Sequence, residues 1–189
     1  MLPGDLYRIQ AASAQIQHHS QGEEYWATCT ALTLYRRARH RGRLAKVWAA
    51  LMGRPSTLLD LDAVRAACTL GSAHAAGMRA VPVGLIRGSE GRCQDFDPGF
   101  RPLRPDCRDR WVRIAVARLM RTLLPPVTLT LVGDRYFVVD GHHRISVARA
   151  LGQAEIDAEV TVCEFAGPLP WEQPALVCFP ALSRLAGGV

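Results

Sequence analysis

The sequence has no closely spaced cysteine pair, no N-terminal secretory signal and no long apolar run. Its six cysteines stand singly along the 189 residues, which argues against a structural zinc site, and we assign no metal ligands. The first residues lack a basic segment followed by an apolar one, and the longest apolar runs are far shorter than a membrane span. We therefore expect a cytoplasmic protein with free thiols, no disulfides and no transmembrane segment.

Acidic residues are fewer than basic ones, 17 against 23, and arginine supplies nearly all the cations. The net charge of +6 favours anionic partners such as nucleotides, nucleic acid or anionic lipid, without choosing among them. An apolar content of 49% with 21% charged residues is typical of a folded globular chain. The length of the chain and the absence of internal repeats indicate one domain, alone or with an appendage.

The first 68 residues predict an α-helical N-terminal appendage. Apolar residues recur at helical spacing from the start, and we expect Gly22 to interrupt the helix. A second helix is predicted from about residue 23 to residue 52, ended by Gly53. Residues 58–64 are typical of a short capped helix that joins the appendage to the core.

A basic segment lies in the second helix, at residues 36–46, which begin with Arg36 and end with Lys46. It contains six cations and no acid. It could contact the phosphates of nucleic acid, and it could equally be a solvated helix face. A basic amphipathic helix that lies on a membrane is a third interpretation.

A first strand is predicted at residues 78–86. Pro82 lies within it and cannot donate a hydrogen bond to a neighbour, so this strand belongs at a sheet edge or starts there. The next segment, residues 93–105, is rich in Pro, Gly, Asp and Phe and predicts an ordered loop held down by Phe96 and Phe100.

An amphipathic helix is predicted from residue 108 to residue 123, with Asp106 as its N-terminal cap. Two prolines, Pro125 and Pro126, end this helix and force the chain into an extended path.

The centre of the chain predicts two strands and a helix in succession. Residues 127–132 and 135–139 have the composition of buried strands, joined by a Gly-Asp turn. A helical pattern follows at residues 142–151 and ends at Gly152. Residues 156–165 alternate apolar and polar side chains and predict a half-buried strand.

The corner between the second strand and the helix carries Asp140, Gly141, His142, His143 and Arg144. The first N–H groups of a helix lack internal partners and, together with the helix dipole, favour an anion there. Asp140 has two open roles. It could cap the helix, or it could orient an arginine, bind a ligand hydroxyl or metal, or act as a base. Gly141 permits a positive φ or the close approach of a phosphate.

His142 and His143 are adjacent, so their side chains diverge by about 100° on a helix and make a poor chelating pair. We expect one of them to touch a phosphate while the other packs or faces solvent. Arg144 is a cation in the first helical turn, where the dipole favours acids. We interpret this conflict as a sign of an anion bound in front of the helix.

A second candidate segment is the loop after the first strand, where two glycines flank polar side chains. Gly88 is one of these glycines, which allow the backbone to approach a ligand closely. Ser89, Glu90 and Arg92 offer a hydroxyl, a carboxylate and a guanidinium. An ordinary turn has the same composition, and both interpretations stay open.

The central motifs resemble those of the ParB/sulfiredoxin fold. They read Pro-Pro-Val, a Gly-Asp turn, Tyr-Phe-Val-Val-Asp-Gly-His-His-Arg, Ser-Val-Ala and Ala-Leu-Gly. The resemblance covers residues 78–165 and implies an α+β core with a small mixed sheet at residues 69–165, followed by an irregular tail at 166–189. In that family a Gly-x-x-Arg corner at a helix start binds nucleotide phosphates, which implies this role for Gly141 and Arg144.

Two branches of the family fit poorly. Sulfiredoxins carry a catalytic Cys in this corner, where this chain has His142 and no Cys nearby. Partition ParB proteins have Gly-Glu-Arg-Arg here, whereas this chain has His-His between the glycine and the arginine. Only 24 residues follow Phe165, too few for the DNA-reading module of those proteins.

The Asp-Gly-His corner is similar to that of the free-serine kinases, single-domain relatives that use a nucleotide to phosphorylate serine. This similarity implies that Asp140, His142 and His143 approach the transferring phosphoryl group. It also implies a base from the loop after the first strand, a position that Glu90 could fill.

We therefore predict a ParB-like protein that binds ATP, ADP or CTP, with Mg²⁺ as an accompanying ion. It would hydrolyse the nucleotide or transfer a phosphoryl group to a small molecule such as an amino acid. The alternatives are a non-catalytic nucleotide switch and a DNA-binding protein that uses residues 36–46. A homodimer stays open.

Overall fold

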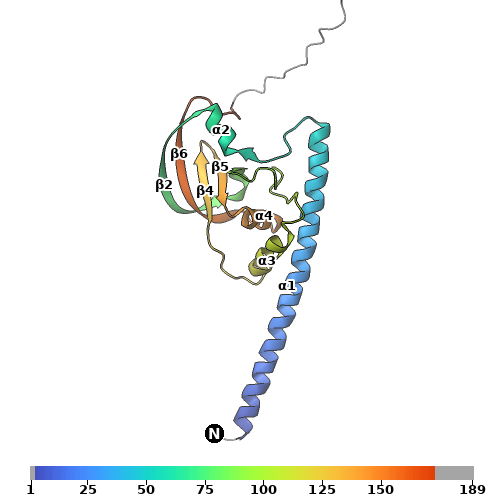
Figure 1. The fold of residues 1–189 in the computed structure, drawn as a ribbon. Helices are drawn as coiled ribbons and strands as arrows, with labels where there is room; N and C mark the ends of the chain where they lie inside the picture. The colour runs from blue at the N-terminus through green and yellow to red at the C-terminus, as the bar shows by residue number, and fades with distance from the viewer. Residues whose placement is uncertain (1–2, 173–189) are drawn as a thin grey trace, which may run out of the picture.

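The computed structural model describes residues 3–172. Helix α1 (Pro3–Leu51) is one continuous helix that extends well past the rest of the molecule (Figure 1). The predicted interruption at Gly22 is wrong, because one glycine costs a helix interior only about 1 kcal/mol. The predicted end near Gly53 is confirmed, and that glycine has a φ of 62°.

A six-stranded mixed sheet forms the other half of the fold, in the order β1-β3-β5-β4-β6-β2. The strands are β1 (Leu59–Asp60), β2 (Thr69–Pro82), β3 (Ile86–Ser89), β4 (Val127–Val132), β5 (Arg135–Asp140) and β6 (Glu155–Ala166). β1, β3 and β5 are parallel, β4 is antiparallel to β5 and parallel to β6, and β6 is antiparallel to β2. The predicted α+β class with a mixed sheet is confirmed.

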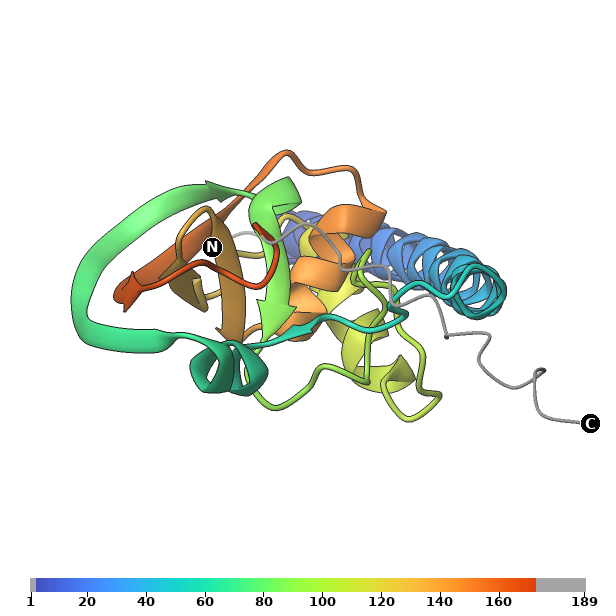
Figure 2. The same cartoon turned by 90° about the horizontal axis from the view of Figure 1, so that it is seen from above.

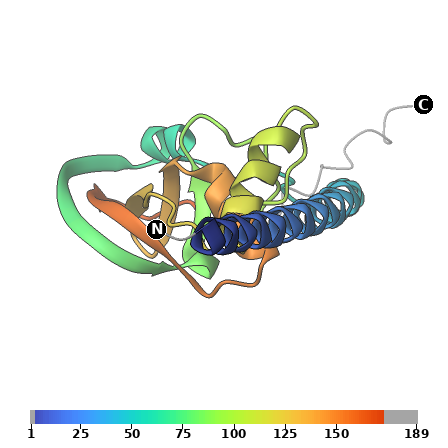
Figure 3. The same cartoon turned by 90° about the horizontal axis from the view of Figure 1, so that it is seen from below.

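Helices α3 (Arg108–Leu119) and α4 (His142–Ala150) lie between the sheet and α1 (Figures 1 and 2). The long strand β2 curves around the far side of the sheet (Figure 3). The central strands β4 and β5, their turn, helix α4 and strand β6 all follow the predicted order. The glycine after α4, Gly152, has a positive φ of 72°.

Strand β2 begins nine residues earlier than the prediction of residue 78 and ends at Pro82. It lies at a sheet edge, as Pro82 requires, and a short 3₁₀ turn η1 (Val83–Leu85) separates it from β3. The sequence misses the first half of β2 because its small residues are exposed and show no apolar alternation. Pairing along β6 defines that half instead, for example Ala73 with Cys163.

The predicted short helix near residue 60 is confirmed as α2 (Leu61–Ala67), and the Asp60 side chain accepts a hydrogen bond from Asp62 N at 3.1 Å. Leu61 and Val64 are buried in a cluster with residues of β4 and β5. The two residues before α2 form β1, so the segment that we grouped with the N-terminal helices contributes an edge strand to the sheet.

Helix α3 is shorter than predicted, because Arg121 adopts a positive φ of 57° just beyond its end. Asp106 as its cap is also wrong. Cys107 is the N-cap residue and no side chain caps the helix, while Asp106 lies 3.6 Å from Arg104 Nε. The loop at residues 93–105 is anchored as predicted, since Phe96 and Phe100 are fully buried.

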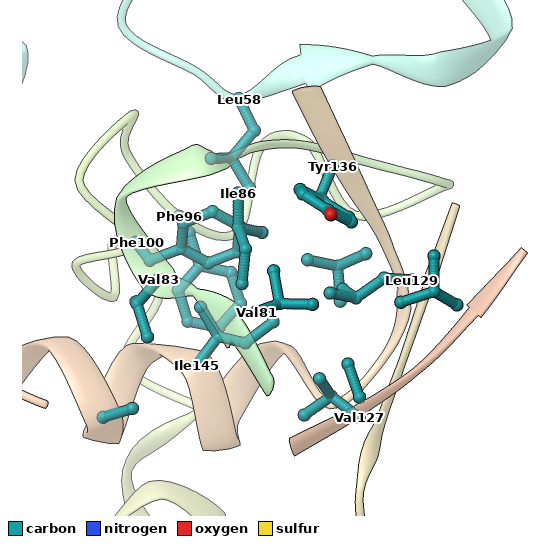
Figure 4. Close-up of a cluster of buried hydrophobic side chains, with 14 residues drawn as sticks. Leu58, Val81, Val83, Ile86, Phe96, Phe100, Val127, Leu129, Tyr136 and Ile145 are labelled. Atoms are coloured by element: carbon teal, nitrogen blue, oxygen red, sulfur yellow. The ribbon is translucent and has the colours of Figure 1, made fainter. Parts of the chain in front are cut away.

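The main hydrophobic core fills the space between the sheet and α4, where Ile145 points toward the strands (Figure 4). A separate cluster joins α1 to the core through Tyr35, Trp111 and Val147. Trp111 Nε1 also donates to Ser146 Oγ at 2.8 Å. These contacts fix the middle of α1 against α3 and α4.

The first part of the predicted tail lies against the core, because Leu169 is buried and Trp171 Nε1 donates to Asp134 Oδ1 at 3.0 Å. The rest of the tail, with Cys178, lies outside the described residues. The five cysteines in the described part of the chain are free thiols. None of the described helices is both long and apolar enough to cross a membrane.

Candidate functional site

The predicted corner lies where β5 leads into α4, and Gly141 makes the connection with φ 102° and ψ 19°. A side chain there would place its Cβ 2.5 Å from Val127 Cγ1, so both the backbone and the packing require glycine. Asp140 as the helix cap is wrong. Gly141 is the N-cap residue without a side-chain cap bond, and Asp140 still pairs with Thr128 in the sheet.

The Arg144 guanidinium is held by the protein itself. It donates to the carbonyl oxygens of Pro125 and Pro126 at 2.5 and 2.6 Å, and to Asp140 Oδ2 at 2.6 Å. Its side chain is only 12% exposed. The cation in the first turn is therefore balanced by these three acceptors, and no external anion is needed to explain it. A phosphate contact by Arg144 stays a prediction.

The sheet brings the predicted loop to the corner, because β3 and β5 are parallel neighbours. Ser89 pairs with Val138, and Glu90 N donates to the carbonyl oxygen of Val138 at 2.9 Å. Ser89 Oγ then lies 2.6 Å from His142 Nε2, and both side chains are buried. Residues far apart in the sequence thus meet at one hydrogen bond.

The predicted loop is wrong at Gly88 and Ser89, because both residues belong to strand β3 and pair with β5. Gly88 has a packing role there. A Cβ at Gly88 would overlap with the Phe137 ring on β5, so glycine is required for β3 to lie beside β5. A ligand contact at Gly88 stays a prediction.

The two other polar side chains of the loop differ in their surroundings. Glu90 Oε1 accepts a hydrogen bond from Arg65 Nη1 of α2 at 2.8 Å, and this carboxylate is 34% exposed. Arg92 is exposed, and its backbone N–H donates to Ser89 Oγ at 3.3 Å. This segment therefore carries an exposed guanidinium, that of Arg92, and a carboxylate, that of Glu90, which is already paired with Arg65.

Both histidines pack against Phe96 rather than diverging into solvent. The His142 ring is stacked on Phe96 with centroids 6.1 Å apart, and His143 meets the same ring edge-on at 5.4 Å. Burial, with smaller contributions from nearby arginines, lowers the pKa of each imidazole to about 4. Both rings are therefore neutral at pH 7. A buried nitrogen of His143, Nδ1, has no hydrogen-bond partner among the described residues.

Chemically, the corner combines a buried hydroxyl–imidazole pair, free helix N–H groups and an exposed arginine. A neutral imidazole can accept or donate a proton, and helix N–H groups with a guanidinium suit an oxyanion. In the described part of the chain, no three His, Cys, Asp or Glu side chains gather that could hold a metal ion.

Several residues of the site have no signal in the sequence. Arg65 lies 25 positions before Glu90, and only the pairing of β1 with β3 brings α2 near the loop. Phe96 could be predicted as a buried anchor, but its position beneath both histidines depends on the path of the loop.

The fold and site define an α+β protein with a mixed sheet and a histidine-containing corner at a helix start. No family model matches the sequence, and no curated protein is significantly similar to it. Among solved structures, the chain is similar in part to sulfiredoxin from Arabidopsis thaliana, at 19% identity and a TM-score of 0.34. The match covers 44% of this chain and 82% of that chain.

Proposed function

We propose that this protein has a ParB/sulfiredoxin-like core and binds the phosphates of a nucleotide at the corner between β5 and α4. The observation that carries the proposal is the 2.6 Å contact between Ser89 Oγ and His142 Nε2. It joins the last residue of β3 to the first residue of α4, and the sequence singles out both segments as places where a ligand can approach.

The start of α4 would supply most of the phosphate contacts. Its first internal hydrogen bond runs from Ile145 N to Gly141 O at 3.0 Å, so the N–H groups of His142, His143 and Arg144 precede the internal ladder. These groups, with the dipole of α4, favour an anion in front of the helix. Arg92 would add a full positive charge beside them.

The neutral histidines fit this role. An imidazole without charge can donate to a phosphate oxygen or accept a proton, according to its tautomer. Nδ1 of His143 is buried without a hydrogen-bond partner in the described residues. A ligand group that forms a hydrogen bond with this nitrogen would offset the cost of burying it unpaired.

Mg²⁺ would enter with the nucleotide. This ion keeps most of its ligands as waters and phosphate oxygens, so one or two protein carboxylates are enough. Asp140 would be the carboxylate that reaches the ion, which leaves Glu90 for proton transfer, and each of the two already has an arginine partner.

Turnover is the second part of the proposal. A hydroxyl of a small acceptor, or water, would form a bond to the γ-phosphorus while the bond to the β,γ-bridging oxygen breaks and the nucleoside diphosphate leaves. The proton of the hydroxyl would pass to Glu90 as general base. A protein that binds nucleotide without this step is the alternative, a nucleotide switch.

Nucleotide binding is tested by thermal shift and calorimetry with ATP, ADP and CTP, with and without Mg²⁺, because a ligand of the native state raises the melting temperature. Replacing Arg92 by Gln removes one charge-assisted contact and should weaken binding about tenfold or more. Arg113→Gln, on the exposed side of α3, is the matched control and should leave the affinity unchanged.

Failure of all nucleotides to bind, or equal affinity for Arg92→Gln and the wild type, would contradict the phosphate site. If nucleotide binds, then Glu90→Gln separates the two versions of the proposal. Loss of turnover with retained binding supports the enzyme, and the absence of turnover in the wild type favours the switch.

A further inference from the structure

A pocket of about 570 Å³ lies between α1 and the end of α4 that is opposite the corner. Its wall comes from α1, the turn η1, the loop around Phe100 and the last turn of α4. Its charged lining residues are all arginines: Arg37 and Arg41 from α1, Arg101 from the loop and Arg149 from α4. Among the residues that the structure describes, neither Asp nor Glu lines it.

Arg149 forms a fixed positive wall of this pocket. Its Nη2 donates to the carbonyl oxygens of Val83 and Ile86 at 2.9 and 2.6 Å, and its guanidinium carbon lies 5.0 Å from the centre of the Phe100 ring. Burial lowers the pKa of Arg149 to about 10, so the side chain remains a cation at pH 7. Its hydrogen-bond partners are neutral carbonyl oxygens, and Asp97 is the acid whose charge acts on it.

The two arginines of α1 have even less compensation. Arg37 and Arg41 are four residues apart, so their side chains lie on the same face of the helix and repel each other. Neither has an ion-pair or hydrogen-bond partner in the part of the chain that the structure describes. Arg101 forms an ion pair with Asp97, in which Nη1 lies 3.2 Å from Oδ2. Four arginines thus line one space, and Asp97 is the one carboxylate among the described residues that forms an ion pair with any of them.

We propose that this pocket binds a small polyanion, a molecule with two or more phosphate groups. Arginine forks bind phosphate oxygens in pairs, and several forks around one space match several phosphate groups. The volume lies within the range of about 300–1,000 Å³ that is usual for small-molecule sites. Leu34, Val83 and Phe100 add apolar surface, which suits the rest of an organic phosphate.

The pocket is independent of the corner. The two sites lie at opposite ends of α4, a helix of nine residues. The C-terminal end of a helix carries partial negative charge, which Arg149 in the last turn offsets. The attraction for an anion therefore comes from the arginines of α1 and the loop, not from a helix start.

The test is calorimetric titration of the full chain with inorganic pyrophosphate at low and at physiological salt. The key variant is Arg37→Gln/Arg41→Gln, because both side chains are exposed and their loss leaves the core intact. The matched control is Arg36→Gln/Arg43→Gln, which removes the same charge from the same helix outside the pocket. We expect the Kd to rise about tenfold or more in the first variant and less than about twofold in the second.

Two further measurements separate this site from other sources of binding. In Arg92→Gln, pyrophosphate affinity at the pocket should be unchanged, so the result does not depend on the corner. A duplex oligonucleotide titrated against both double variants tests a nucleic-acid surface. The proposal is overturned if duplex binding is tight and falls equally in both variants, because α1 would then be a general phosphate-backbone contact. It is also overturned if pyrophosphate fails to bind at about 1 mM, or binds equally to both double variants.

Discussion

The two ends of α4 handle charge in opposite ways. At the start of α4, polar groups are paired with one another: Arg144 with Asp140, and Ser89 with His142. At the other end, arginines from separate segments line a common space, and Arg149 donates to carbonyl oxygens and lies over an aromatic ring. The first end is a preorganised polar corner. The second end carries an excess of positive charge, which an anionic ligand can neutralise.

The corner and the pocket differ in how their residues are distributed along the chain. The residues of the corner are contiguous in the sequence, so they can be recognised as one motif. The pocket is made by α1, a loop and α4, and only the fold brings their arginines together.

Replacing Gly141 by Ala should cause the largest loss of stability. The substitution adds backbone strain of about 1–3 kcal/mol and overpacking against Val127 of about 1–3 kcal/mol. Gly152→Ala, at the other end of α4, is the matched control, since that glycine also has a positive φ but nothing within 4 Å of its Cβ position. It should lose only about 1–2 kcal/mol, the cost of the left-handed backbone without the overpacking. Denaturant unfolding measures both, and equal losses would contradict the close packing at the corner.

Stability should fall with acid between pH 6.5 and pH 4 because of the two histidines. Their pKa is lowered to about 4 in the folded protein, from 6.5. Between these values the unfolded chain binds protons that the folded chain excludes, so the free energy of unfolding decreases as pH falls. Each histidine contributes up to about 3 kcal/mol across this range.

The variant His143→Gln isolates this effect. Subtracting its pH profile of stability from that of the wild type removes the contributions of the carboxylates and of the other histidines. We expect a shallower loss of stability below pH 6.5 in the variant. Arg149 does not titrate in this range, so it does not contribute to the change of the free energy of unfolding with pH. Parallel profiles would show that His143 is not buried as a neutral ring.

Arg144 and Arg149 can be compared directly, because each guanidinium joins α4 to backbone carbonyls. Replacing either by Gln should cost about 1.5–3 kcal/mol, since hydrogen bonds from a charged donor are lost and carbonyl oxygens are left without partners. Lysine should restore little, because it lacks the planar fork. Unfolding curves test this, and a loss below about 0.5 kcal/mol at either site would contradict a structural role there.

The smallest effect concerns the arginines of α1. Arg37→Gln/Arg41→Gln should raise the free energy of unfolding by a few tenths of a kcal/mol at low salt, because it removes a like-charge pair at four-residue spacing. The gain should disappear at high salt, where such repulsion is screened. Destabilisation by this double variant would show that the two side chains have partners that hold α1 to the core.

Much of the fold could be predicted from the sequence, because its signals are local. The apolar runs of β4 and β5, their Gly-Asp turn and the glycine after α4 define that unit without reference to the rest of the chain. The first half of β2 could not be predicted in this way, since only its pairing with β6 makes it a strand. Gly22 shows the opposite error, because helix formers on both sides outweigh one glycine.

The sequence predicts which residues belong to the candidate site better than it predicts the contacts between them. The motif brings attention to Asp140 and Arg144, but their mutual ion pair and the two proline carbonyls depend on the start of β4. Ser89 was one polar residue in a glycine-flanked loop, and the parallel pairing of β3 with β5 gives it His142 as a neighbour. Arg149 gave no signal, because a surface arginine and a buried one look the same in a sequence.

The most direct test of the central claim, a nucleotide-phosphate site at the start of α4, is calorimetry with ATP and Mg²⁺ on three proteins. These are the wild type, Arg92→Gln and Arg37→Gln/Arg41→Gln. We predict a loss of affinity of about tenfold or more at the corner in Arg92→Gln, and an unchanged corner affinity in the double variant. Unchanged affinity in Arg92→Gln, or no ATP binding by the wild type, would contradict the claim.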